Sequence, residues 1–276
     1  MTRIAVYTDH TYRREGDRLF VDRAFPLFLV ELARHLDRLV IAGKVDPRPG
    51  RSHYELPPEI GFAELPYFKS VTRPISAAYA MGGALRRFWR ALSDVDGVWL
   101  FGPHPLSIAF VAIAVSRGRR VTLGVRQDFP RYVRARHPRR RSLWAAGDLM
   151  EALWRALARR LGTIVVGPEL AARYPTSDTM EVSISLVSET EILPTAHAGP
   201  SWEEEELRVL SVGRLEQEKN PLLLVEVLAR LLVADPRWRL IVCGEGPLEA
   251  DMRRRAEEFG VAERLTLRGY VAQDGG

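Results

Sequence analysis

The sequence predicts an α/β fold in which parallel sheets form two domains. Short apolar runs alternate with longer amphipathic stretches along the chain, which is the pattern of βαβ units. Residues 188–206, which contain two prolines, a glycine and an acidic run, interrupt this alternation, and it restarts after them. Hydrophobic residues make up 46% of the chain and charged residues 27%, so a packed core is expected and disorder of the whole chain is excluded.

Residues 1–187 are expected to form the first domain. Its predicted strands are Arg3–Thr8, Arg38–Ala42, Ile60–Leu65, Gly97–Phe101, Arg120–Val125 and Thr163–Val166. Helices are predicted at 22–35, 70–92, from about 106, and at 142–161, because their apolar residues recur at helical spacing. Residues 43–59 are rich in proline, glycine and charge and are interpreted as a loop.

Residues 188–206 are interpreted as a linker and 207–276 as a second domain. The predicted strands there are Leu207–Val212, Arg239–Cys243 and Leu265–Leu267, with helices at 221–232 and 247–259. Because three strands and two helices make a thin domain, we expect this domain to be incomplete at Gly276. A small natural domain is the alternative.

The charge distribution differs between the two halves. The net charge is +5, but residues 201–276 carry −4 and residues 1–200 carry +9. A basic face suits a phosphate-bearing substrate, an anionic membrane or a nucleic acid.

Cys243 is the only cysteine, so no internal disulfide can form, which fits a cytoplasmic protein. No apolar run reaches the roughly 20 residues that cross a bilayer.

The segment between the first strand and helix of the second domain carries the clearest chemistry. Gly213 permits a sharp turn, and Arg214 and Lys219 place two cations near the start of a helix. Asn220 is the expected N-cap and Pro221 the first helical residue. Two cations with free backbone amides would bind a diphosphate and stabilise the negative charge that grows on it as a leaving group.

The alternative for this segment is a solvated loop in which Arg214 and Lys219 pair with Glu216 and Glu218. The residue counts favour the binding role. The chain holds three lysines against 37 arginines, so a lysine here indicates a need for a compact point charge.

Three segments in order, 212–221, 238–247 and 264–271, resemble the donor-binding domain of the retaining glycosyltransferases called group 1, or family 4. They match its G-R-L-x-x-E-K loop, its strand ending in G-x-G-P and its strand ending in G-Y-V. The resemblance implies that Arg214 and Lys219 contact the donor diphosphate as catalytic groups. It implies further donor contacts at Gly213, Gly244, Glu245, Gly246, Gly269, Tyr270 and Val271; for Tyr270, strand-end packing is an equal alternative.

This resemblance implies the GT-B fold, with two Rossmann-like βαβ domains of which the second is incomplete. It implies transfer of a sugar, with retention, from a nucleotide-diphosphate donor to a hydroxyl of a glycan, lipid or small molecule, with no metal and no further cofactor. The family's Glu-x7-Glu element has no counterpart in the right context, so we expect it beyond Gly276. A non-catalytic fragment that binds sugar nucleotide or a membrane is the alternative function. A dinucleotide-dependent oxidoreductase is excluded because residues 8–17 lack G-x-G-x-x-G.

The acceptor-side candidates follow strands of the first domain. They are Gly16, His104 and Asp128. Relatives often have a pair of glycines where this chain has only Gly16, and a histidine near Gln127. His104, between two prolines, could instead only fix its loop.

The basic stretch Arg131–Arg160 contains Trp144 and Trp154 on an amphipathic helix. It could rest on an anionic membrane at the cytoplasmic face, with the tryptophans at the interface. The alternative is a solvated loop followed by a core helix with buried tryptophans. No nucleic-acid partner is expected, because zinc-ligand spacing, a helix-turn-helix and an RNP-like motif are missing.

Overall fold

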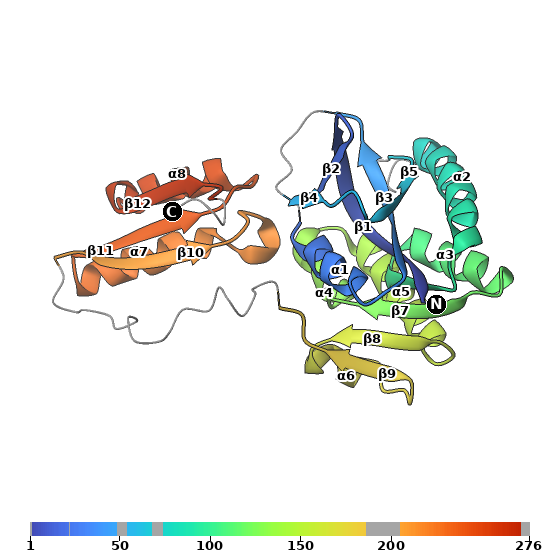
Figure 1. The fold of residues 1–276 in the computed structure, drawn as a ribbon. Helices are drawn as coiled ribbons and strands as arrows, with labels where there is room; N and C mark the ends of the chain where they lie inside the picture. Colours follow the sequence, from blue (N-terminus) through green and yellow to red (C-terminus); the bar gives the residue numbers. More distant parts are fainter. Residues whose placement is uncertain (1, 22, 49–53, 68–73, 186–204, 272–276) are drawn as a thin grey trace. The chain divides into compact units, whose positions relative to one another are not determined.

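A computed structural model describes residues 2–21, 23–48, 54–67, 74–185 and 205–271 (Figure 1). The chain divides into two compact units, one of residues 1–133 and 139–192 and the other of residues 134–138 and 193–276. The predicted linker, 188–206, lies mostly outside the described residues. Within the described part, no helix is both long and apolar enough to cross a membrane.

The first unit is built on a nine-stranded sheet. Seven parallel strands lie in the order β5-β3-β1-β6-β7-β8-β9, and β2 and β4 add an antiparallel extension. The strands are β1 (Arg3–Glu15), β2 (Arg18–Val21), β3 (Arg38–Asp46), β4 (Tyr54–Leu56), β5 (Gly61–Leu65), β6 (Gly97–Gly102), β7 (Arg120–Val125), β8 (Gly162–Val166) and β9 (Thr179–Val182). This parallel arrangement confirms the βαβ alternation that the sequence predicts.

Helices separate these strands in sequence. They are α1 (Phe25–Ala33), α2 (Pro74–Ala91), α3 (Pro105–Ser116), α4 (Phe129–Arg136), α5 (Arg141–Ala158) and α6 (Pro168–Arg173), with a 3-10 turn, η1 (Leu92–Asp94). Along β6, Val98 and Leu100 contribute to one core and Trp99 and Phe101 to another, because alternate strand residues point to opposite faces. The sheet is therefore buried on both faces, as a parallel sheet requires.

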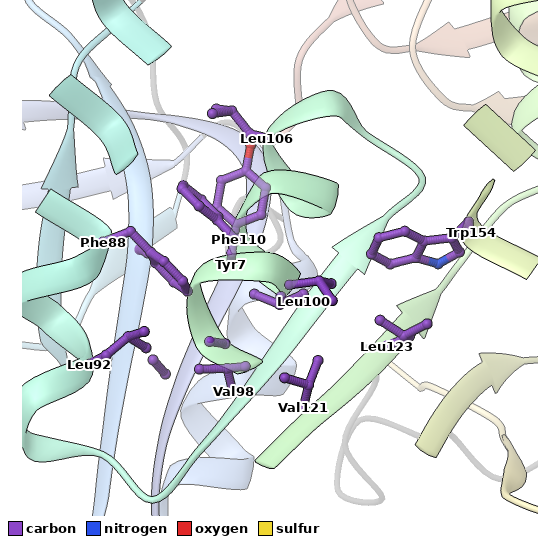
Figure 2. Close-up of a cluster of buried hydrophobic side chains, with 14 of the residues drawn as sticks. Tyr7, Phe88, Leu92, Val98, Leu100, Leu106, Phe110, Val121, Leu123 and Trp154 are labelled. Carbon is purple, nitrogen blue, oxygen red and sulfur yellow. The ribbon is translucent and has the colours of Figure 1, made fainter. Parts of the chain in front are cut away.

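The larger of these two cores includes aromatic residues from the sheet and from α2 and α3 (Figure 2). Phe88 stacks on Phe110 with 3.9 Å between ring centroids, and Tyr7 meets Phe110 edge-on at 4.9 Å. Trp154 of α5 belongs to the same core and has no exposed surface. These contacts hold α2 and α3 against one face of the sheet.

β1 is longer than predicted and is bent by a bulge. It pairs with β6 through Ile4–Tyr7, whereas Tyr12–Glu15 pair with β2 instead. Its register with β3 shifts between Tyr7 and Thr11, so Thr8, Asp9 and His10 lie in the irregular part. The sequence prediction ended this strand at Thr8, because the following residues are polar.

The second unit, as described, contains a three-stranded parallel sheet in the order β10-β11-β12. Its elements are β10 (Leu207–Val212), η4 (Gln217–Lys219), α7 (Leu222–Ala234), β11 (Trp238–Cys243), α8 (Glu249–Glu258), η5 (Ala262–Arg264) and β12 (Leu265–Gly269). Leu240 and Val242 pack with Val225 and Leu228 of α7 and with Met252 of α8. The two helices thus share one face of the sheet, as expected when successive right-handed crossovers advance in one direction.

Several predicted boundaries were wrong. Within the predicted loop 43–59, β3 continues to Asp46 and Tyr54–Leu56 form β4, which pairs with β2. The predicted helix at 22–35 is shorter, beginning at Phe25. β2, β9, α4 and α6 were not predicted, because each is a short or polar segment without a clear period. The other predicted strands and helices are confirmed to within a few residues.

Replacing Phe110 with alanine tests the aromatic core. Phe110 is fully buried, so F110A should lower the free energy of unfolding of the first unit by about 3–5 kcal/mol. Val115 lies on the same helix and is 54% exposed, so V115A should change it by less than about 0.5 kcal/mol. Urea denaturation followed by tryptophan fluorescence measures both, and equal losses would contradict this description of the core.

Candidate functional site

Three loops meet at the carboxyl edge of the second sheet. They follow β10, β11 and β12, and backbone hydrogen bonds join them. Gly213 N donates to Cys243 O at 2.9 Å, Gly244 N donates to Gly269 O at 2.7 Å, and Leu215 N donates to Glu245 O at 3.0 Å. Since parallel strands end at the same edge, residues far apart in sequence are brought together there.

Two glycines in the loop after β11 are required by the close approach of the loop after β10. A Cβ on Gly244 would lie 1.9 Å from the carbonyl oxygen of Gly213, and a Cβ on Gly246 would lie 2.4 Å from that of Leu215. Gly244 also has a φ of 150°. By contrast, a Cβ on Gly213 would meet nothing within 4 Å. The loops are thus packed on each other, and space remains open beside Gly213.

The two predicted cations differ in their surroundings. Arg214 forms ion pairs with Glu216 (2.5 Å) and Glu218 (3.3 Å), as in the alternative interpretation of this loop. Lys219 is exposed and forms no ion pair within the described residues. Lys219 therefore supplies the positive charge of this loop that no carboxylate in the described part neutralises.

The backbone of this loop corrects two details of the sequence analysis. Asn220 is not an N-cap: its φ of 47° and ψ of 53° place it in the left-handed region, where it ends η4, and Pro221 precedes the first residue of α7. The amides were expected to be free, but those of Gly213, Leu215 and Lys219 donate within the unit. This leaves side-chain charge as the main attraction for an anion.

The loop after β12 exposes two residues of the predicted donor-binding set. Tyr270 is 38% exposed and Val271 45%. Tyr270 N donates to Glu245 Oε1 at 3.4 Å, and Gly269 turns the chain with a φ of 69°. The structure therefore brings the predicted residues of all three loops to one edge.

A second polar cluster occupies the carboxyl edge of the first sheet. Its members come from four segments: the β1 bulge, the end of β3 and the loops after β6 and β7. They are Asp9, His10, Lys44, His104 and Arg126. Asp9 is the solvent-exposed member, whereas Lys44 is only 8% exposed. Protein atoms around Asp9 displace part of its hydrating water and oppose its charge, although the residue keeps exposed surface. The nearby His104, Lys44, His10 and Arg126 outweigh this effect and lower its pKa. Asp9 is therefore an accessible carboxylate.

His104 is held as a neutral imidazole. Its Nδ1 accepts a hydrogen bond from Leu106 N at 3.2 Å, which caps α3, and the Tyr7 hydroxyl lies 3.4 Å from the same nitrogen. The ring proton is consequently on Nε2. Burial lowers the pKa of His104 to about 4, although the charge of Asp9 partly opposes this shift.

Arg126 is enclosed by aromatic rings. Its guanidinium carbon lies 4.0 Å from the centroid of Phe25 and 5.0 Å from that of Phe101, a cation–π arrangement. Nη1 donates to His10 Nε2 at 3.1 Å. Burial and then the charge of Arg126 lower the pKa of His10 to about 3. His10 therefore stays neutral at physiological pH.

The other two acceptor-side candidates have structural contacts. Gly16 forms the turn between β1 and β2 with a φ of 61°. Asp128 accepts a hydrogen bond from Arg131 N at 3.0 Å at the start of α4 and pairs with Arg173. Arg173 in turn lies 3.7 Å from the buried Glu151. Among the three candidates, only His104 is linked to the polar cluster by the contacts described.

Sequence reasoning missed most of this cluster, namely Asp9, His10, Lys44 and Arg126. A signal was present, because each of them comes within two residues after the end of a strand predicted from the sequence. The rarity of lysine, which singled out Lys219, applied equally to Lys44. Within the described residues, no group of three or more histidine, cysteine, aspartate or glutamate side chains could hold a metal ion.

Residues 194–275 match the family model "Glycosyl transferases group 1". A 58-residue stretch is 36% identical to the Vi polysaccharide biosynthesis protein VipC/TviE of Salmonella typhi, and covers 21% of this chain and 10% of that protein. A 68-residue stretch is 28% identical to the phosphatidylinositol N-acetylglucosaminyltransferase gpi3 subunit of Schizosaccharomyces pombe, and covers 25% and 15%. Only a small part of each curated relative is thus matched.

Solved structures resemble nearly the whole chain. Sucrose-phosphate synthase from Thermosynechococcus elongatus gives a TM-score of 0.67 at 14% identity, over 99% of this chain and 71% of that one. The E. coli trehalose-6-phosphate structure bound with UDP-2-fluoro glucose gives 0.61 at 12%, over 99% and 74%. WaaG, a glycosyltransferase involved in lipopolysaccharide biosynthesis, gives 0.60 at 14%, over 97% and 70%. These likenesses confirm the predicted α/β fold of the GT-B type.

The packing of the two loops predicts opposite effects for two glycine substitutions. G244A should destabilise the second unit by more than about 2 kcal/mol, because the methyl group meets the Gly213 carbonyl and the backbone angle is unfavourable. G213A should fold with nearly unchanged stability, since its methyl group enters open space. Thermal unfolding followed by circular dichroism compares them, and a stable G244A would show that the loops do not pack as described.

The neutral histidines predict a pH dependence of stability. Unfolded imidazoles bind a proton below about pH 6.5, whereas those of His104 and His10 do so only near 4 and 3. The unfolded state thus binds more protons in this interval, so the free energy of unfolding should fall as the pH drops from about 6.5 to 4. Urea denaturation at several pH values tests this, and the slope should be smaller in H104N. An NMR titration of His104 with a midpoint near 6.5 would contradict it.

Proposed function

We propose that this chain takes part in transferring a sugar from a nucleotide-diphosphate donor to a hydroxyl acceptor. The main support is the edge of the second sheet, where three glycine-bearing loops meet beside Lys219, which is exposed and has no ion pair among the described residues. The match of residues 194–275 to the group 1 glycosyl transferases covers these loops. The GT-B likeness of both units supports the same reaction class.

In this proposal the donor diphosphate binds in the open space beside Gly213, next to the loop after β10. Lys219 contacts the phosphates directly as a point charge. Arg214 joins it by exchanging Glu216 and Glu218 for phosphate oxygens, a change that the 36% exposure of its side chain permits. When the glycosyl–phosphate bond breaks, charge accumulates on the leaving diphosphate. Fixed cations then stabilise the transition state more than the ground state.

The finer features of the reaction rest on the resemblance of this loop to the family. Retention at the anomeric carbon is one of them, and neutralisation of the diphosphate by Lys219 and Arg214 in place of a metal is the other. Gly244–Gly246 would line the donor site and Gly269–Val271 would meet the nucleotide base. A cytoplasmic location, supported by the single cysteine, completes the proposal.

The polar cluster of the first unit supplies groups suited to an acceptor hydroxyl. Asp9 offers an exposed carboxylate that accepts a hydrogen bond, and His104 carries a proton on Nε2 that can be donated. Lys44 and Arg126 keep Asp9 ionised. Gly16 and Asp128 remain acceptor-side predictions. We assign the acceptor hydroxyl to Asp9 and His104, because Asp9 offers acceptor oxygens and His104 offers an Nε2–H donor.

A fragment that binds sugar nucleotide without transferring sugar is the second candidate. Binding of UDP by calorimetry and hydrolysis of a panel of UDP- and GDP-sugars by mass spectrometry separate the two. Binding with turnover supports the enzyme, and binding alone supports the fragment. If neither occurs, both candidates are rejected for this chain.

The role of Lys219 predicts a selective loss. Because its side chain is exposed and unpaired within the described part, K219Q should fold normally. It should weaken UDP binding roughly 10- to 100-fold, the value of a charge-assisted contact. It should also lower turnover by about 10²–10³, as for loss of one group that stabilises developing charge. R230Q, an exposed arginine on α7, is the matched control and should leave both unchanged.

A further inference from the structure

The helix α5 (Figure 1) exposes both apolar and basic side chains. Leu149 is 57% exposed and Leu153 42%. Helical spacing places them on one side of the helix together with small residues that are also exposed: Ala145, Ala146, Ala152 and Ala156. The opposite side buries Gly147, Glu151, Trp154 and Ala158. The helix therefore has two apolar faces, and only one of them is used by the core.

Arginines flank the exposed apolar face at both ends of the helix. They are Arg139, Arg140, Arg141, Arg155, Arg159 and Arg160, all exposed. None of them forms an ion pair within the part of the chain that the structure describes. The helix has 18 residues and is about 27 Å long, so the two groups of charge stand at its ends with the leucines between them. Asp148 is the single acidic residue on this outward face.

We propose that this face of α5 docks on an anionic lipid bilayer. A helix that lies in the membrane plane inserts apolar side chains below the headgroups and places basic side chains at their level. Leu149 and Leu153 have the position for the first role, and the end arginines for the second, because arginine can extend its charge to the headgroups while its stem stays apolar. The surface is independent of the donor site in the second unit.

The structure also changes the residues expected to make this contact. Trp154 was predicted at the interface, but it is fully buried in the core, and Trp144 is half-buried. The two leucines therefore replace the tryptophans as the inserted groups. The exposed leucines favour a bilayer over a nucleic acid, since phosphate contacts alone need no apolar side chain.

Another helix shows why both features are needed. α7 also exposes apolar residues, with Leu223 50% and Val227 41% accessible. On that helix the only arginine is Arg230, and Glu226 accompanies it. An anionic surface would gain little from α7. The helix α7 thus provides an exposed apolar surface without the basic ends.

Sedimentation of the chain with vesicles tests the proposal. The chain should sediment with vesicles of phosphatidylcholine mixed with phosphatidylglycerol, and not with phosphatidylcholine alone. R159Q/R160Q should weaken binding roughly 25-fold, at about fivefold per basic residue. L149Q/L153Q should weaken it at least about tenfold by removing the inserted side chains. Added salt should weaken the wild type more than R159Q/R160Q.

Matched variants elsewhere guard against general effects. L223Q/V227Q on α7 removes two exposed apolar side chains, and R253Q/R254Q on α8 removes two charges that are paired with Glu249 and Asp251. Both should sediment like the wild type. Equal binding to neutral vesicles, or equal losses in these controls, would overturn the proposal. A change from a dimer to a monomer in L149Q/L153Q without vesicle binding would assign this face to a second copy instead.

UDP binding, which reports on the proposed donor site, is measured separately in the same variants. UDP binding measured without vesicles should be unchanged by the α5 substitutions, because α5 contributes no residue to the donor loops. Loss of vesicle binding with intact UDP binding therefore rejects only the docking surface. Vesicle binding without UDP binding rejects only the proposed function.

Discussion

The carboxyl edge of the second sheet depends on a close contact between two stretches of backbone. At Gly244 and Gly246 the loop after β11 approaches the loop after β10 so closely that a single methyl group cannot be accommodated. The contact is closed by hydrogen bonds from Gly213 N and Leu215 N. It fixes where the segment carrying Arg214 and Lys219 leaves the sheet. The glycines thus serve the packing of the protein itself, and the ligand role predicted for them would follow from that packing.

The two units hold their charges in contrasting ways. In the first unit, Lys44 and Arg126 are enclosed with neutral histidines around one accessible carboxylate, Asp9. Burial keeps these groups in fixed positions, and mutual attraction offsets part of its cost. In the second unit, Lys219 stands in solvent on a short 3-10 turn. The first arrangement suits recognition of hydroxyl groups at defined positions, and the second suits a highly charged group that is attracted from a distance.

The sequence predicts the fold well because apolar runs mark the buried strands directly, as in Arg120–Val125 and Leu207–Val212. It also locates the three loops of the second unit, since their motifs are contiguous. The cluster around Asp9 could not be found in this way, because its members come from four separate segments and meet only through the strand order. Local conformation was another limit. Asn220 has the composition of an N-cap but adopts the left-handed conformation, because η4 ends there.

The bulge in β1 is anchored on both sides. Before it, Ile4–Tyr7 hydrogen-bond to β3 and β6, and after it the strand continues between β2 and β3. Most binding loops in α/β proteins can lengthen or shorten without disturbing the scaffold. Here an insertion next to Asp9 would shift the register of the hairpin and turn Tyr12 out of its core. Divergence of specificity at this edge is therefore restricted to exchanges of side chains at constant length.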